Sequence, residues 1–126
     1  MNVLRDTHRA LVPDGLLLDF HPVCPPWPRV VARGEQLGEL HDETFLDELH
    51  ATEAGMLEAV RRGLFEHLAT RRHDLAEHYA DPLELLESWA DELSNWMSAE
   101  LEQRLRTMTE PVDVVDRLVF HLYRRR

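Results

Sequence analysis

The spacing of apolar residues near the N-terminus predicts a short helix followed by a strand. Leu4, His8 and Leu11 recur at i, i+4 and i+7, which is typical of one face of a helix over residues 3–11. The Val-Pro-Asp-Gly sequence at residues 12–15 has the turn residues that end such a helix. The next run, residues 16–20, is apolar on both faces and therefore predicts a buried central strand.

The following segments predict a stiff loop, a hairpin and a long helical region. Four prolines make residues 21–28 unsuitable for regular structure. Two short apolar runs flank Gly34-Glu35, a pair that suits a type II′ hairpin turn. Residues 43–109 then read as helical, with Gly55 and Gly63 marking a bend or break. The apolar positions along one face of the first part are Phe45, Leu49, Met56, Val60 and Leu64.

A second helix start and a C-terminal strand complete the pattern. Asp81 followed by Pro82 is a typical helix start, and an apolar stripe that includes Trp89 and Trp96 predicts one helix over residues 82–108. Residues 112–123 fit both periods, but their β-branched and aromatic side chains favour a strand. We therefore expect a single α+β domain over residues 1–126, with a small mixed sheet of about four strands covered by long helices.

Composition and charge restrict the function. The chain carries 24 acidic and 14 basic residues, a net charge of −10, which disfavours nonspecific binding to nucleic acid or to anionic membranes. No apolar run approaches the roughly 20 residues of a membrane span, and the first residues do not resemble a signal peptide. The single cysteine, Cys24, excludes an internal disulfide and has no basic neighbour to activate it. These features indicate a cytoplasmic protein.

One segment resembles a known enzyme family. The order of helix, Pro-Asp-Gly turn and buried strand over residues 4–19 resembles the second half of a class I S-adenosylmethionine-dependent methyltransferase. In that family a helix ending Arg-x-Leu-x-Pro-Gly-Gly leads into the fifth strand, and Arg-Ala-Leu-Val-Pro-Asp-Gly stands at residues 9–15 here. Residues 112–126 are similar to the family's closing antiparallel strands. The resemblance implies a Rossmann-like sheet with the cofactor-binding half absent.

The glycines do not supply that missing half. The five glycines form no Gly-x-Gly motif, so no loop for a phosphate or nucleoside can be assembled from them. We therefore expect no cofactor, and S-adenosylmethionine only if a separate chain completes the fold. The isolated chain is expected not to bind it.

Asp19 and His21 are the candidate catalytic residues. They lie at the carboxyl end of the predicted central strand, where open α/β sheets place ligands. A histidine that a carboxylate orients can act in acid–base chemistry near neutral pH. The alternative is a polar strand end that feeds the proline loop.

The histidines also raise a metal hypothesis. His73 with Glu77, and Asp74 with His78, would form i,i+4 pairs on a helix. The alternative is a solvated face with local ion pairs, and we assign no metal site on this pattern.

The expected role is a methyltransferase-like, non-catalytic partner or small-molecule binding module. A residual enzyme that uses Asp19 and His21 is the first alternative, and half of a split methyltransferase is the second. An apolar stripe on a helix that overhangs the core predicts a homodimer.

Overall fold

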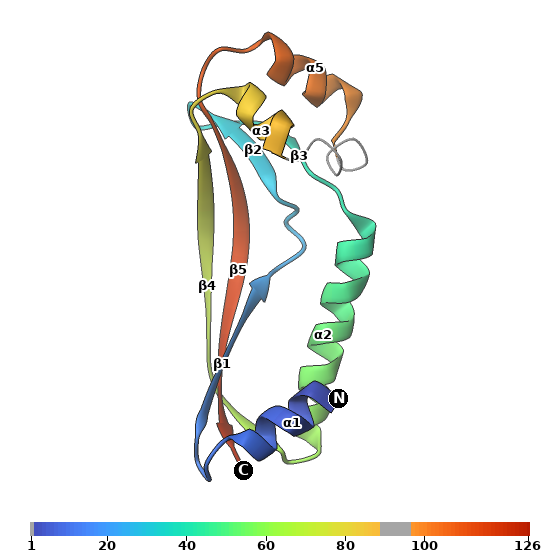
Figure 1. The fold of residues 1–126 in the computed structure, drawn as a ribbon, viewed down its shortest axis with the longest axis vertical. Helices are drawn as coiled ribbons and strands as arrows, with labels where there is room; N and C mark the ends of the chain where they lie inside the picture. Colours follow the sequence, from blue (N-terminus) through green and yellow to red (C-terminus); the bar gives the residue numbers. More distant parts are fainter. Residues whose placement is uncertain (1, 89–96) are drawn as a thin grey trace. The chain divides into compact units, whose positions relative to one another are not determined.

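The computed structural model describes residues 2–88 and 97–126 and has the expected α+β class (Figure 1). Its described helices are α1 (Asn2–Ala10), α2 (Glu43–Arg61), α3 (Pro82–Ser88) and α5 (Ala99–Thr107). Its strands are β1 (Leu16–Pro22), β2 (Arg29–Ala32), β3 (Glu35–Glu39), β4 (Phe65–Tyr79) and β5 (Val112–Arg125). The sheet has five strands and is antiparallel, whereas we expected a mixed sheet of about four strands.

The chain divides into two compact units. Unit 1 contains Met1–Pro22, Thr44–His73 and Leu118–Arg126, and thus α1, β1 and nearly all of α2. Unit 2 contains Val23–Glu43 and Asp74–Arg117, and thus β2, β3, α3 and α5. Strands β4 and β5 each contribute residues to both units.

Strand β1 is an edge strand, so the prediction of a buried central strand is wrong. It pairs with β5 in an antiparallel register from Leu16 opposite Arg124 to Pro22 opposite Leu118, and it stands at the end of the strand order. Exposed and half-buried positions alternate along it. The leucines and the phenylalanine made the segment apolar on both faces, but in the described chain only one face of β1 is covered.

The prediction of helix through residues 65–79 is also wrong, because this segment forms β4. Most of its side chains between Phe65 and Tyr79 are exposed, and the strand is held through pairing with β5. Long-range pairing therefore overrides the local spacing that favoured a helix. As a result, the predicted helical pairs of His73 with Glu77 and of Asp74 with His78 do not exist.

Gly63 explains why α2 ends where it does. The residue has φ of +75°, and the amides of Gly63 and Leu64 donate to the carbonyls of Val60 and Ala59. This is the hydrogen-bond pattern of a Schellman cap, which glycine favours. Gly55, in contrast, lies within the continuous helix, so the expected bend at Gly55 is absent.

The two glycines should respond in opposite directions to alanine. A Cβ at Gly55 would meet only the side chain of Leu4 at 3.9 Å, so Gly55→Ala should stabilise the fold by about 0.5–1 kcal/mol through helix propensity. Gly63→Ala should destabilise it by about 1 kcal/mol, because alanine is strained at positive φ. Urea denaturation measures the change in the free energy of unfolding for both variants. A change of the same sign in the two variants would contradict this description of the helix end.

The single helix predicted over residues 82–108 is interrupted. Helix α3 begins as expected, with the Asp81 carboxylate accepting from the Leu83 amide at 3.0 Å. Its described residues are Pro82–Ser88, whereas residues 97 and 98 are not helical and α5 has its own N-cap at Ser98, whose hydroxyl accepts from the Leu101 amide. Trp89 and Trp96 lie outside the described residues. The argument for a dimer through one long helical stripe therefore does not hold.

The hairpin forms as predicted, but with a different turn. Ala32 pairs with Glu35, so Arg33 and Gly34 form the two-residue loop. Both have positive φ, at 51° and 76°, which is the type I′ geometry rather than the expected type II′.

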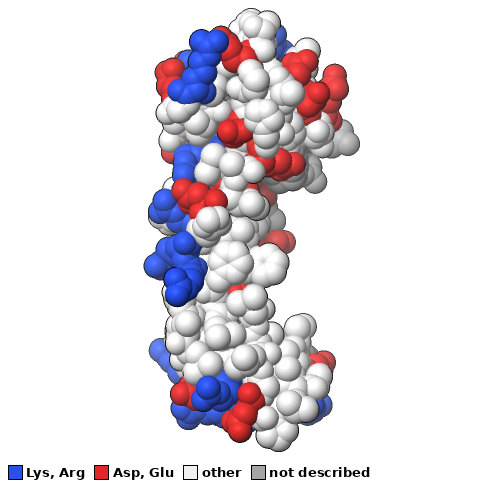
Figure 2. All heavy atoms as spheres, turned by 90° about the vertical axis from the view of Figure 1, so that its left-hand side faces the viewer, with Lys and Arg blue, Asp and Glu red and all other residues white. Residues whose placement is uncertain are grey.

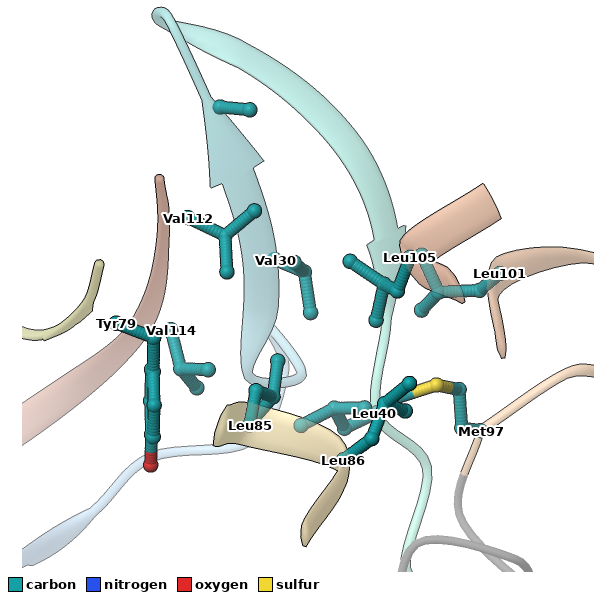
Figure 3. Packing of buried hydrophobic residues seen from close by; sticks show 11 residues of the cluster. Val30, Leu40, Tyr79, Leu85, Leu86, Met97, Leu101, Leu105, Val112 and Val114 are labelled. Carbon is teal, nitrogen blue, oxygen red and sulfur yellow. The ribbon is translucent and has the colours of Figure 1, made fainter. Parts of the chain in front are cut away.

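Each unit has its own apolar core. In unit 2 the cluster joins both hairpin strands, α3, α5 and β5, and Val30, Leu85 and Leu105 have no solvent exposure (Figure 3). The core of unit 1 contains Met56 and Ala59 from α2 with Phe65 and Tyr123 from the sheet. Leu17 of β1 packs against this second core, and the predicted site residues Asp19 and His21 lie on the same face of the strand as Leu17.

Candidate functional site

The structure brings Asp19 and His21 together on the covered face of β1. They alternate along the strand with Leu18 and Phe20 and follow Leu17, which packs against the core of unit 1. Nδ1 of His21 lies 3.1 Å from Oδ2 of Asp19, within hydrogen-bond distance. With Nδ1–H donating to this carboxylate, the ring has the orientation expected of a carboxylate–histidine pair.

The second nitrogen of His21 faces a carboxylate that sequence reasoning missed. Nε2 of His21 is buried and has no hydrogen-bond partner among the described residues, and it lies 3.6 Å from Oε1 of Glu53 on α2. Glu53 stands four residues after the buried Leu49 and three before the buried Met56. An acidic residue within an apolar helical stripe was the signal that could have identified it.

This arrangement limits the chemistry of the pair. A general base must present its free nitrogen to a substrate proton. The free nitrogen of His21 instead points at Glu53 across 3.6 Å, and only about a tenth of the side chain is exposed. When protonated, His21 would bridge the carboxylates of Asp19 and Glu53 and thereby connect β1 to α2.

Next to this pair lies a group of three polar side chains that the sequence did not predict. Nε2 of His67 lies 3.2 Å from Nδ1 of His121, and the hydroxyl of Thr70 lies 2.8 Å and 3.0 Å from these two nitrogens. We call His67, Thr70 and His121 the imidazole triangle. The rings of His21 and His121 have centroids 5.9 Å apart, so the triangle borders the Asp19–His21 pair. The triangle depends on strand pairing, which the local pattern does not encode.

The surroundings of His121 favour its neutral form. Burial is the largest cause that lowers the pKa of His121, and His67 and His21 lower it further, while the Asp19 carboxylate opposes them. Burial and the same carboxylate raise the pKa of the neighbouring Tyr123.

The lowered pKa of His121 predicts a contribution to pH-dependent stability. The folded chain binds fewer protons at His121 than the unfolded chain, so this contribution is complete above the unfolded pKa of 6.5 and is lost as the pH falls through the lowered folded value. We expect His121→Asn to lose less unfolding free energy than wild type between about pH 7.5 and about pH 5.5. Denaturant titrations at both pH values test this, and an equal loss in the two proteins would refute it.

The remaining candidates have structural partners. The Asp74 carboxylate binds Arg117 and Arg29, each at 3.0 Å, and the hydrogen bond from Arg117 is the main cause that lowers its pKa. His78 lies 2.7 Å from the carboxylate of Asp113. Burial and Glu39 raise the pKa of the Cys24 thiol, as expected of a cysteine without an activating base. Within residues 2–88 and 97–126, no group of three or more His, Cys, Asp or Glu side chains is arranged to hold a metal ion.

Comparisons with known proteins do not assign the chain to a family. No protein-family model matches the sequence, and no curated protein is significantly similar to it. Among the described helices, none combines the length and the apolar character that a membrane crossing requires.

Proposed function

We propose that this chain is a methyltransferase-like, non-catalytic association module that binds a second copy of itself through the outer face of β1 and β5 in unit 1. One observation carries the proposal. Leu16, Leu18 and Phe20, at alternate positions of an edge strand, are 56%, 58% and 62% exposed. Exposed apolar faces on edge strands mark interaction surfaces, because proteins otherwise protect them.

The apolar surface continues onto the neighbouring strand through the half-buried side chains of Phe120 and Leu122. The register places Leu18 opposite Leu122 and Phe20 opposite Phe120, and directly opposed residues share a sheet face. The rings of Phe20 and Phe120 are stacked, with centroids 5.6 Å apart. Figure 2 views the side of the molecule away from α2 and shows a broad uncharged area over unit 1. We call Leu16, Leu18, Phe20, Phe120 and Leu122 the apolar strip.

Charge supports self-association through unit 1. Unit 1 contains nine arginines and eight acidic residues, a net charge of +1, whereas unit 2 contains five arginines and sixteen acidic residues, a net charge of −11. Two copies that meet through unit 1 therefore avoid the repulsion that two strongly acidic surfaces would cause. Two-fold pairing brings the same strip from both copies together.

The geometry favours association over catalysis. A residual enzyme would need the free nitrogen of His21 to reach a substrate, but that nitrogen is buried beside Glu53. Because His21 lies between the carboxylates of Asp19 on β1 and Glu53 on α2, its role is instead to hold β1 against α2.

The unpaired edge of β1 favours a second candidate function. Strand β1 has β5 as its neighbour on one side and stands at the end of the strand order in the described sheet. A separate chain that carries a cofactor-binding half could add a strand there and cover the apolar strip. The chain would then complete a split methyltransferase. An adjacent reading frame that carries Gly-x-Gly-x-Gly would favour this alternative.

Sedimentation equilibrium distinguishes the two candidates. Self-association predicts a mass of twice 14.8 kDa at micromolar concentration. A monomer that binds a separate chain predicts 14.8 kDa alone and a larger mass only after that chain is added. The mass of a single chain throughout this concentration range would refute the proposed dimer.

A further inference from the structure

We propose that the imidazole triangle binds a divalent transition-metal ion, with His67 and His121 as nitrogen ligands and Thr70 as an oxygen ligand. The triangle lies wholly within unit 1. His67 and Thr70 are exposed and His121 is half-buried, so an ion can reach all three from solvent.

The distances between the three atoms match those around a bound ion. The contacts measure 2.8, 3.0 and 3.2 Å. Two imidazole nitrogens at 2.0–2.1 Å from a tetrahedral zinc ion lie roughly 3.3 Å apart. An ion about 2.1 Å from each corner would sit roughly 1 Å out of the plane of the triangle.

In the absence of an ion, hydrogen bonds hold the three side chains together when one imidazole N–H donates to the Thr70 oxygen and the Thr70 hydroxyl donates to the other imidazole nitrogen. A neutral imidazole has one N–H and the threonine hydroxyl has one O–H. The two facing nitrogens cannot both be protonated at 3.2 Å without strong repulsion. When both of these nitrogens are unprotonated, they and the hydroxyl oxygen present lone pairs within 3.2 Å of one another, and a cation bound by all three replaces the hydrogen bonds between them.

The ligand types indicate the class of metal. Imidazole suits zinc, copper and nickel, whereas calcium and magnesium prefer oxygen ligands. Two histidines and one hydroxyl leave coordination positions for water, so we expect an open site of moderate affinity. The described residues contain no metal-binding group of three or more His, Cys, Asp or Glu side chains, and the triangle has only two such side chains. Its affinity should therefore be lower than that of a site with three strong ligands.

The metal proposal is independent of the proposed dimer. His121 alternates along β5 with Phe120 and Leu122 and shares the face of Asp19, which is opposite to the apolar strip. Loss of one property therefore need not remove the other.

Calorimetric titration of the full chain, purified without a polyhistidine tag, tests the proposal with Zn²⁺ and Ni²⁺. We expect a dissociation constant in the micromolar range for at least one ion. His67→Asn and His121→Asn should each weaken binding at least tenfold, and Thr70→Val should weaken it less. The matched control is His73→Asn, on the same strand and in the same unit but outside the triangle, which should bind like wild type.

The results separate a built site from adventitious binding. Circular dichroism establishes that each variant is folded, and the ring signals of His67 and His121 should shift together in NMR spectra during the titration. Binding weaker than about 1 mM, unchanged binding in both triangle variants, or an equal loss in His73→Asn would each overturn the proposal.

Discussion

Glutamate at both Leu18 and Phe20 should weaken self-association at least 100-fold. Both side chains are more than half exposed in the single chain, so the double variant Leu18→Glu/Phe20→Glu should still fold. In the proposed dimer, however, two carboxylates per copy would enter an apolar interface without partners, and each costs several kcal/mol or prevents contact altogether. Sedimentation velocity over a concentration series measures the change.

Leu57→Glu provides the matched control for this experiment. Leu57 is also in unit 1 and is 54% exposed, but it lies on α2 rather than on the apolar strip. We expect this variant to associate like wild type. If Leu57→Glu dissociates the protein and the β1 variant does not, the interface lies elsewhere.

Phe65→Ala should lower the free energy of unfolding by about 3–5 kcal/mol, the range for large aromatic truncations in cores. Phe65 is 1% exposed and contacts His8 edge-on at 5.7 Å and Tyr123 at 6.3 Å between ring centroids. It belongs to the small core cluster of unit 1, so the resulting cavity has few neighbours that could refill it.

Leu68→Ala is the comparison on the same strand. Leu68 is 36% exposed on β4, and we expect it to cost about 1 kcal/mol or less, in line with sites away from a core. Urea denaturation gives both values. Similar losses in the two variants would show that unit 1 has no core at Phe65.

Local signals predicted the parts of the fold that depend on neighbours in sequence. Helix α1, the hairpin, the start of α3 at Asp81 and the C-terminal strand all carry caps, turn residues or β-branched runs that act within a few residues. The α+β class followed from their order. The turn type of the hairpin could not be predicted in this way. Because Ala32 pairs with Glu35, the two-residue loop lies one residue earlier in the chain than we expected.

Features that depend on distant residues were missed. Strand β4 has the spacing of a helix, and only its pairing with β5 makes it a strand. The apolar run of β1 predicted burial on both faces, but the described chain covers one face and leaves the other exposed.

The residues of the candidate site also fall into those that local sequence predicts and those that only long-range packing brings together. Asp19 and His21 are two residues apart on one strand, so their proximity could be predicted from the sequence alone. Glu53, His67 and His121 approach them only through the packing of α2 and the strand register. Glu53 alone had a local signal, as the acidic residue within an apolar helical stripe.

The most direct test of the proposed association is a set of isotope-filtered NOEs in a mixture of labelled and unlabelled chains. Contacts between protons of different copies should involve the methyl groups of Leu16 and Leu18 and the ring of Phe20, and should be absent from α2. Intermolecular NOEs confined to other surfaces, or none at a concentration where the sedimented mass is that of two chains, would contradict a dimer through the apolar strip.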